Sequence, residues 1–145
     1  MRFASIAIGA AACVSTASGS VVSTFDTDAD GWGITGDANG FTWSATGGST
    51  GETDDGYVFA NDAGQGIIWN FDAPVKFLGD QSEFAGGMLS WDLIQISTPG
   101  SDIDDQPDVI LKGAGLVLVV EAGASPAGTW TSYDVALSEA GGWRI

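Results

Sequence analysis

The sequence predicts an all-β domain, and three observations lead to that prediction. Its 145 residues include 22 glycines and 6 tryptophans but only 4 lysine or arginine residues, which is the composition of a protein built from strands and turns. Several short stretches alternate apolar and polar residues with the period of two that half-buried strands require. In residues 109–121, two aliphatic runs flank Gly113-Ala114-Gly115, which is the pattern of a β-hairpin.

The expected strands, taken in chain order, cover residues 21–25, 41–44, 57–60, 66–71, 88–93, 109–112, 116–121 and 130–137. In the strand that ends at residue 93, Leu89, Trp91 and Leu93 fall on one face, so this strand is expected at the centre of the fold. A bent crossing with Pro74 and several glycines leads into it. Residues 141–145 read as a strand entering the core, and a domain should not end there. The chain is therefore expected to be truncated at its C-terminus.

The N-terminus has the pattern of a secretory signal peptide. Arg2 supplies the positive region, residues 3–14 form an apolar run, and residues 15–20 are small, with cleavage expected after Ala17 or within the next three residues. The apolar run is about a dozen residues, well short of the roughly 20 that a membrane-spanning helix needs. The expected division is a signal peptide over residues 1–20 and one secreted domain over 21–145. Because Cys13 lies in the leader, the mature chain would have no disulfide and no thiolate metal site.

Charge and residue types exclude several classes of function. The net charge of −15 repels phosphate backbones and anionic lipids, which disfavours nucleic-acid binding and membrane binding. The chain has no histidine, which excludes Ser/His and Cys/His nucleophiles and histidine metal centres. Glycoside hydrolysis by carboxylates alone remains open, and the candidate acids by residue type are Asp80, Glu83, Asp92 and Glu121.

One acidic stretch has the spacing of a calcium-binding loop. Asp26, Asp28 and Asp30 alternate ahead of a glycine, and Asp37 follows six residues after that glycine. Alternate carboxylates in a tight turn can converge on a hard cation, although no amphipathic helix flanks this loop. The alternative is a solvated turn that leaves the first strand, with Trp32 packed in the core. Residues 101–108, with four further aspartates, are open to the same two interpretations.

Trp130 is the tryptophan whose strand pattern points it outward. In residues 130–137, Thr131, Tyr133, Val135 and Leu137 share one face, which leaves Trp130 on the other. An exposed indole can stack on a sugar ring, so Trp130 is a candidate carbohydrate contact. The alternative is that the indole covers a sheet edge or packs under a loop.

Several ordered blocks of the sequence resemble one known family, the laminin IV type A domain, also called laminin B. The blocks are Ala73-Pro74, Phe77-Leu78-Gly79-Asp80, Gly86-Gly87-Met88-Leu89 and the stretch from Asp108 to Leu116. The resemblance covers residues 57–145, with two departures. Ala85 separates Phe84 from the double glycine, and the chain stops where the family pattern continues through further strands. The resemblance implies an antiparallel jelly-roll-like β-sandwich, similar to galactose-binding and carbohydrate-binding modules, that is extracellular and not catalytic.

The resemblance and the residues together predict a secreted, non-catalytic β-sandwich for extracellular adhesion or matrix-type interactions. Its expected partner is an extracellular protein or a glycan, no cofactor is required, and calcium is the candidate ion. A carbohydrate-binding module that uses Trp130 is the first alternative. A fragment of a carboxylate-dependent glycosidase or lyase is the second.

Overall fold

The computed structural model describes residues 5–16, 19–64, 68–96, 106–126 and 128–145, with side chains from residue 13 onward. In these ranges the strands are β1 (Ser5–Thr16), β2 (Gly19–Ser23), β3 (Gly33–Gly36), β4 (Ala38–Ser44), β5 (Tyr57–Asp62), β6 (Trp69–Asp72), β7 (Met88–Gln95), β8 (Val109–Gly113), β9 (Leu116–Val120) and β10 (Thr131–Ala136). Short 3₁₀ turns are η1 (Val75–Phe77), η2 (Ser82–Phe84) and η3 (Glu139–Gly141). Every strand pair is antiparallel, which confirms the predicted fold class.

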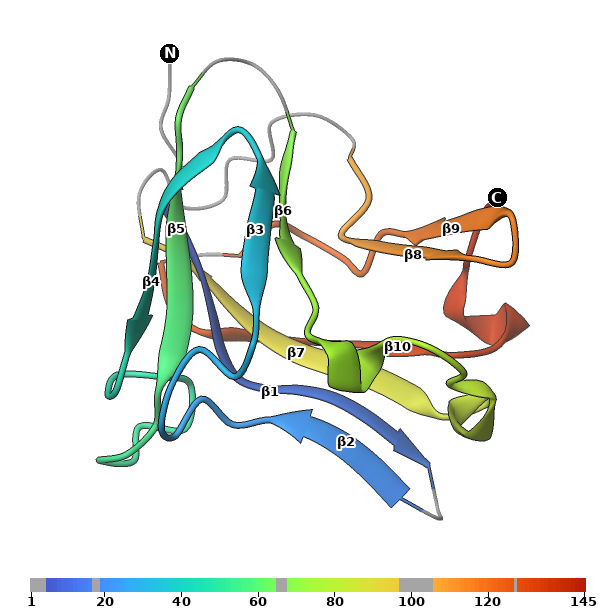
Figure 1. Cartoon of the computed structure of the whole chain (residues 1–145), viewed down its shortest axis with the longest axis horizontal. Coiled ribbons are helices and arrows are strands. Elements are labelled where there is room, and N and C mark those ends of the chain that lie inside the picture. Colours follow the sequence, from blue (N-terminus) through green and yellow to red (C-terminus); the bar gives the residue numbers. More distant parts are fainter. Residues whose placement is uncertain (1–4, 17–18, 65–67, 97–105, 127) are drawn as a thin grey trace.

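Six strands form the larger sheet (Figure 1). Their order is β10-β7-β1-β5-β4, with β2 paired to β1 outside this path. β1 lies between β5 and β7, since residues 5–8 pair with residues 58–61 and residues 6–9 pair with residues 92–95. Residues 12–16 of β1 then form a hairpin with β2. Residues 13–15 also pair with residues 88–90 of β7, so β1 is bonded on both sides in each half.

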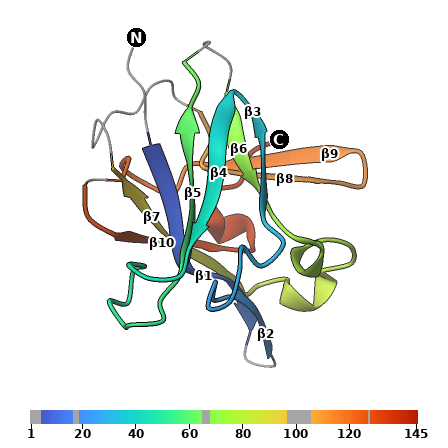
Figure 2. The same ribbon diagram turned by 60° about the vertical axis from the view of Figure 1, so that its left-hand side comes forward.

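The second layer of the sandwich consists of two separate strand pairs, β3–β6 and β8–β9 (Figure 2). The β8–β9 pair covers a first core cluster, in which Trp91, Val120, Tyr133 and Val135 are buried. β6 contributes to a second cluster, which is built around buried Phe25 and Val58 with Ala29, Trp32, Phe41, Trp43, Phe71 and Leu93 packed against it. The two clusters together fill the space between the layers.

The alternation predicted for β7 is confirmed, because Leu89, Trp91 and Leu93 all contact the core. The predicted hairpin is also present, and β8 and β9 join at Ala114 and Gly115. These two residues have φ angles of 51° and 77°, the left-handed values that a tight hairpin turn requires. The final residues form a single bridge in which Arg144 pairs with Val119.

Several expected strand boundaries differ from the structure, and in place of the strand expected over residues 141–145 the chain has the end of η3 and a single bridge. The first strand was expected to run to Phe25 but ends at Ser23, because Phe25 adopts a left-handed φ of 59° and turns the chain. The strand expected from Gly66 begins at Trp69, and residues 65–67 lie outside the described residues. Most of the acidic loop expected at 101–108 also lies outside them, since the description resumes at residue 106.

The segment expected to be a signal peptide is largely the strand β1. Residues 5–16 contribute backbone bonds to β2, β5 and β7, and Cys13 pairs with Val22 and Ser90. The sequence pattern of a leader gave no indication that this segment fits into a sheet. Its removal in the mature protein remains a prediction.

Tyr133 makes the stability of the first core cluster depend on pH. Its ring stacks on Trp91 with centroids 5.6 Å apart, and its hydroxyl donates a 2.8 Å hydrogen bond to the Ala124 carbonyl. Burial raises the pKa of Tyr133, and the Asp108 carboxylate raises it further. Because the folded pKa exceeds the unfolded value of about 10, this stabilisation is complete below that pH and is lost as the pH rises through the folded pKa.

We therefore expect Tyr133 to ionise above the usual tyrosine range and the protein to lose stability there. Absorbance at 295 nm, followed in a Tyr57→Phe background that leaves Tyr133 as the single tyrosine, measures the ionisation directly. Denaturant unfolding at pH 8 and pH 11 measures the stability change, which should be smaller in Tyr133→Phe. An ordinary tyrosine titration in the folded protein would contradict the expectation.

Candidate functional site

The aspartate-rich turn after β2 is organised by a buried aromatic residue. Phe25 is only 1% exposed, and its ring lies 6.2 Å from the ring of Trp32. The Phe25 carbonyl accepts a 2.7 Å hydrogen bond from Trp43 Nε1, and Trp32 Nε1 donates to the Ser23 hydroxyl over 2.8 Å. With Phe25 turned inward, Asp26 is left in solvent. Trp32 packs in the core, as the solvated-turn interpretation predicted.

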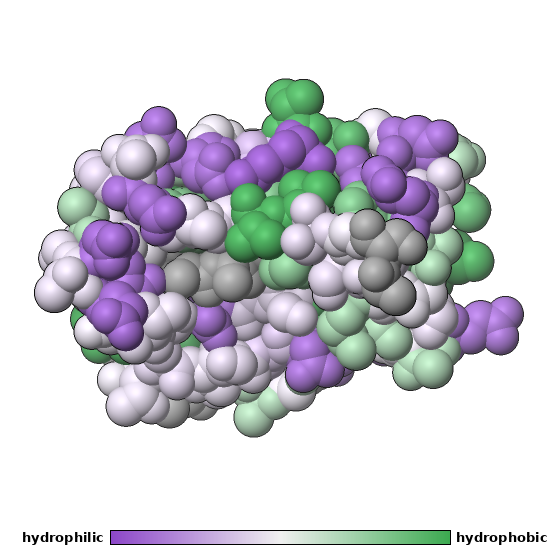
Figure 3. Space-filling view, turned by 90° about the horizontal axis from the view of Figure 1, so that it is seen from below, coloured by the Kyte–Doolittle hydropathy of each residue, from purple (hydrophilic) through white to green (hydrophobic). Residues whose placement is uncertain are grey.

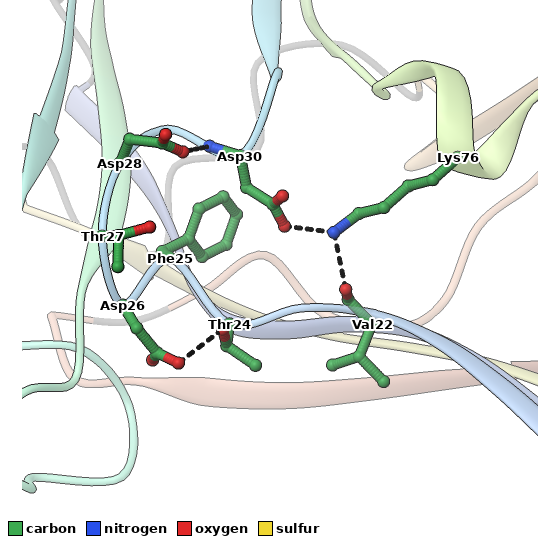
Figure 4. Close-up of a pocket in the computed structure, with 8 residues that line it drawn as sticks. All are labelled: Val22, Thr24, Phe25, Asp26, Thr27, Asp28, Asp30 and Lys76. Atoms are coloured by element: carbon green, nitrogen blue, oxygen red, sulfur yellow. Dashed lines mark hydrogen bonds and ion pairs between the residues drawn. The ribbon is translucent and has the colours of Figure 1, made fainter.

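This turn forms one wall of an open pocket of about 180 Å³ (Figure 4). The residues that line it are Val22, Thr24, Phe25, Asp26, Thr27, Asp28, Asp30 and Lys76. The carboxylates have protein partners. Asp26 accepts from the Thr24 hydroxyl over 2.8 Å, and Asp28 accepts from the backbone N–H of Asp30 over 2.6 Å. Asp30 forms an ion pair with Lys76, whose ammonium also donates to the Val22 carbonyl over 2.6 Å.

The four aspartates of the predicted calcium loop are therefore divided between two places. Asp26, Asp28 and Asp30 line the pocket, whereas Asp37 is 6% exposed in the turn between β3 and β4. There the Asp37 carbonyl accepts a 2.9 Å bond from Ala63. Among the residues described, no three acidic, histidine or cysteine side chains are grouped as a metal ion would need. Calcium binding stays a prediction. In the structure, the positive charge beside Asp30 is the ammonium of Lys76.

A melting experiment tests the calcium prediction directly. A ligand that binds only the native state must raise the melting temperature by mass action. A rise in millimolar calcium relative to chelator, lost in Asp28→Asn, would support the site. An equal melting temperature in both buffers would refute it.

Trp130 lies against a glycine-rich loop. The side chain is half-buried, and its Nε1 donates a 3.1 Å hydrogen bond to the Gly47 carbonyl. Its ring meets Tyr57 edge-on, with centroids 5.6 Å apart and planes at 78°. These contacts match the alternative in which Trp130 packs under a loop. Sugar stacking by Trp130 remains a prediction.

The loop that Trp130 contacts, residues 45–56, is organised by Asp55. This aspartate is 5% exposed, and its Oδ2 accepts from Thr50 N at 2.5 Å, Thr50 Oγ1 at 2.8 Å and Gly51 N at 3.0 Å. Ser49 Oγ donates to Asp92 Oδ2 over 2.6 Å, which ties the loop to β7. No sequence pattern indicates this role, because a Thr/Gly/Asp-rich stretch is equally typical of an unstructured turn.

We expect Asp55→Ala to lower the free energy of unfolding by about 1–3 kcal/mol, because it removes a buried carboxylate that accepts three hydrogen bonds from Thr50 and Gly51. The exposed neighbour Asp54 supplies the matched control, since Asp54→Ala removes the same charge. Chemical denaturation of both variants measures the difference. Equal stability of the two would show that Asp55 does not organise the loop.

The four candidate catalytic acids have separate surroundings. Asp80 is exposed and accepts a 3.0 Å bond from Ser82 N, and the side-chain and backbone hydrogen bonds from Ser82 lower the pKa of Asp80. Asp92 accepts from the Ser49 hydroxyl, and Glu121 forms an ion pair with Arg144 at 2.7 Å. Glu83 is exposed on η2. None of the four lines the pocket beside Lys76.

The sequence blocks that carried the resemblance build turns and strand contacts. Gly79 and Gly86 have φ angles of 85° and 81°, which favour glycine. A Cβ on Gly87 would lie 2.1 Å from the Ser15 carbonyl, so only glycine fits there. Gly87 also accepts a 2.9 Å backbone bond from Leu137, and Asp108 accepts a 2.6 Å bond from Ala122 N.

The fold and these residues place the chain in the class of antiparallel β-sandwich modules. The residues of its sequence blocks form turns and contacts between strands. A family model for laminin B (Domain IV) matches residues 70–145, just over half of the chain. The chain belongs to this family, which is one of non-enzymatic, extracellular structural domains. Searches of curated proteins and of solved structures found no match. In the part of the chain that the structure describes, no helix has the length and apolar character to cross a membrane.

Proposed function

We propose that this chain is an exported, non-catalytic module that makes adhesion or matrix-type contacts outside the cell. The observation that carries the proposal is the laminin B match over residues 70–145, which spans β6 through β10. The N-terminal leader pattern supports export, because it combines Arg2, an apolar run and a small-residue cleavage zone.

The chemistry of the chain supports a binding role over a catalytic one. Without histidine, the chain lacks the most common general base. Three of the four candidate acids, Asp80, Asp92 and Glu121, are engaged separately with Ser82, Ser49 and Arg144. The residues of the family blocks stabilise turns. A domain of this kind is suited to binding through the shape of its surface more than to catalysis through reactive side chains.

The surface suits contacts with proteins. It is strongly acidic, and Figure 3 shows small apolar groups among hydrophilic residues on one face. Large apolar side chains exposed by at least a third are Ile68, Val75, Leu78, Met88, Ile96, Leu111, Leu116, Val117 and Ile145. Apolar groups with a polar surround are typical of protein interaction surfaces.

Two arrays test the proposal, one of immobilised extracellular-matrix proteins and one of neutral and acidic glycans. We expect saturable binding on the protein array that Trp130→Ala leaves unchanged. Glycan binding that Trp130→Ala abolishes would favour the carbohydrate-binding alternative instead. Hydrolysis of a polysaccharide, lost on replacing Asp92 or Glu121, would contradict a non-catalytic role.

A further inference from the structure

The predicted leader and the centre of the larger sheet are the same residues. Residues 5–8 of β1 pair with residues 58–61 of β5, and residues 6–9 pair with residues 92–95 of β7. Both neighbours run antiparallel to β1. Cleavage after Ala17 would remove a strand that is bonded along both edges, not one at the margin of the sheet.

The strands that pair with β1 carry some of the least exposed residues in the described part of the protein. On β5, Val58 and Ala60 are 0% exposed, and on β7, Gln95 is 2% exposed. Without β1, the backbone groups of β5 and β7 that face it would lose their partners, and unpaired strand edges readily add another strand. The gap between β5 and β7 would therefore offer unpaired backbone donors and acceptors on both sides.

We propose that removal of the leader makes this gap an acceptor site for an extended, uncharged segment of a partner protein. The segment would bind by β-augmentation, antiparallel to both β5 and β7. This inference rests on the proposed export with leader cleavage, and it names the kind of partner that an adhesion module of this shape would take.

The neighbours of the gap set the chemistry of that segment. The register position of Ile8 lies level with Val58 on one side and Leu93 on the other, and both belong to the second core cluster. An aliphatic residue suits this position, because a charge level with these two core residues would lack a polar partner. The net charge of −15 further disfavours an acidic segment.

The full chain can be used to test the site if a protease sequence is placed at residues 17–18. After cleavage, a fluorescent synthetic peptide of residues 5–16 serves as the probe, with a peptide carrying Ile8→Asp as its matched control. We expect the probe to exchange into the cleaved chain saturably and the Ile8→Asp peptide to bind at least tenfold more weakly, an order-of-magnitude estimate for burying an unpaired charge. Hydrogen exchange of β5 and β7 should be faster in the emptied chain and slow again when the probe is added.

Two results would overturn the proposal. One is protection of β5 and β7 that persists after the peptide leaves, because another part of the chain would then fill the gap. The other is equal binding of the two peptides. If the emptied chain unfolds, restoration of its circular dichroism by the probe supports the site, and failure to restore it counts against the site.

The mass of the secreted protein separates this inference from the proposed function. Retention of Met1 in that protein would remove the premise of leader cleavage, whatever the peptides do. Cleavage near Ala17 followed by failed peptide exchange would reject the acceptor site alone and leave the adhesion role to the arrays.

Discussion

Phe25→Ala is expected to lower the free energy of unfolding by about 3–5 kcal/mol, the usual cost of truncating a buried phenylalanine. Phe25 is 1% exposed at the centre of the second core cluster, and its ring contacts Trp32. The truncation therefore leaves a cavity beneath the aspartate-rich turn. Denaturant unfolding followed by tryptophan fluorescence measures the loss.

The backbone of Phe25 provides an internal control for this prediction. Its φ of 59° costs any L-residue other than glycine roughly 1 kcal/mol. Phe25→Gly removes the same ring but relieves that strain, so it should be as stable as Phe25→Ala or more stable, the reverse of the usual order in a strand. A glycine variant clearly less stable than the alanine variant would show that the left-handed turn is wrong.

Trp91→Ala is expected to cost a similar amount, about 3–5 kcal/mol. Trp91 is 8% exposed, stacks on Tyr133 at an interplanar angle of 14° and lies in the cluster that joins β7 to β10 and β9. Its removal should also bring the alkaline titration of Tyr133 closer to the ordinary tyrosine range, because the ring becomes more exposed.

Trp91→Phe is the conservative comparison for this site. It keeps an aromatic ring against Tyr133 and should lose much less stability than Trp91→Ala, as unfolding in guanidinium would measure. Similar losses in the two variants would mean that the indole, and not the stacked aromatic pair, holds the cluster together.

Local patterns predicted the strands but not the contacts that connect distant parts of the chain. The alternation in β7 and the glycine-bracketed hairpin are local, so the sequence was sufficient for both. The partner of Asp30 is Lys76, 46 residues further along, and spacing within one loop carries no information about it. The calcium interpretation considered the acidic residues alone for this reason.

The left-handed turn at Phe25 was missed for a related reason. A run of β-branched and aromatic residues predicts an extended strand, and the deviation follows from burial of the Phe25 ring, which only the assembled core provides. In the same way, nothing in residues 45–56 distinguishes Asp55, the buried acceptor, from its exposed neighbour Asp54.

Leu93 packs against both core clusters, although the layer that covers them is divided into two pieces. A disturbance under β8–β9 can therefore reach the packing under β3–β6 through one aliphatic side chain. This shared contact couples the packing energies of the two halves. The sandwich can therefore unfold in a single cooperative transition, although only one of its two layers is a continuous sheet.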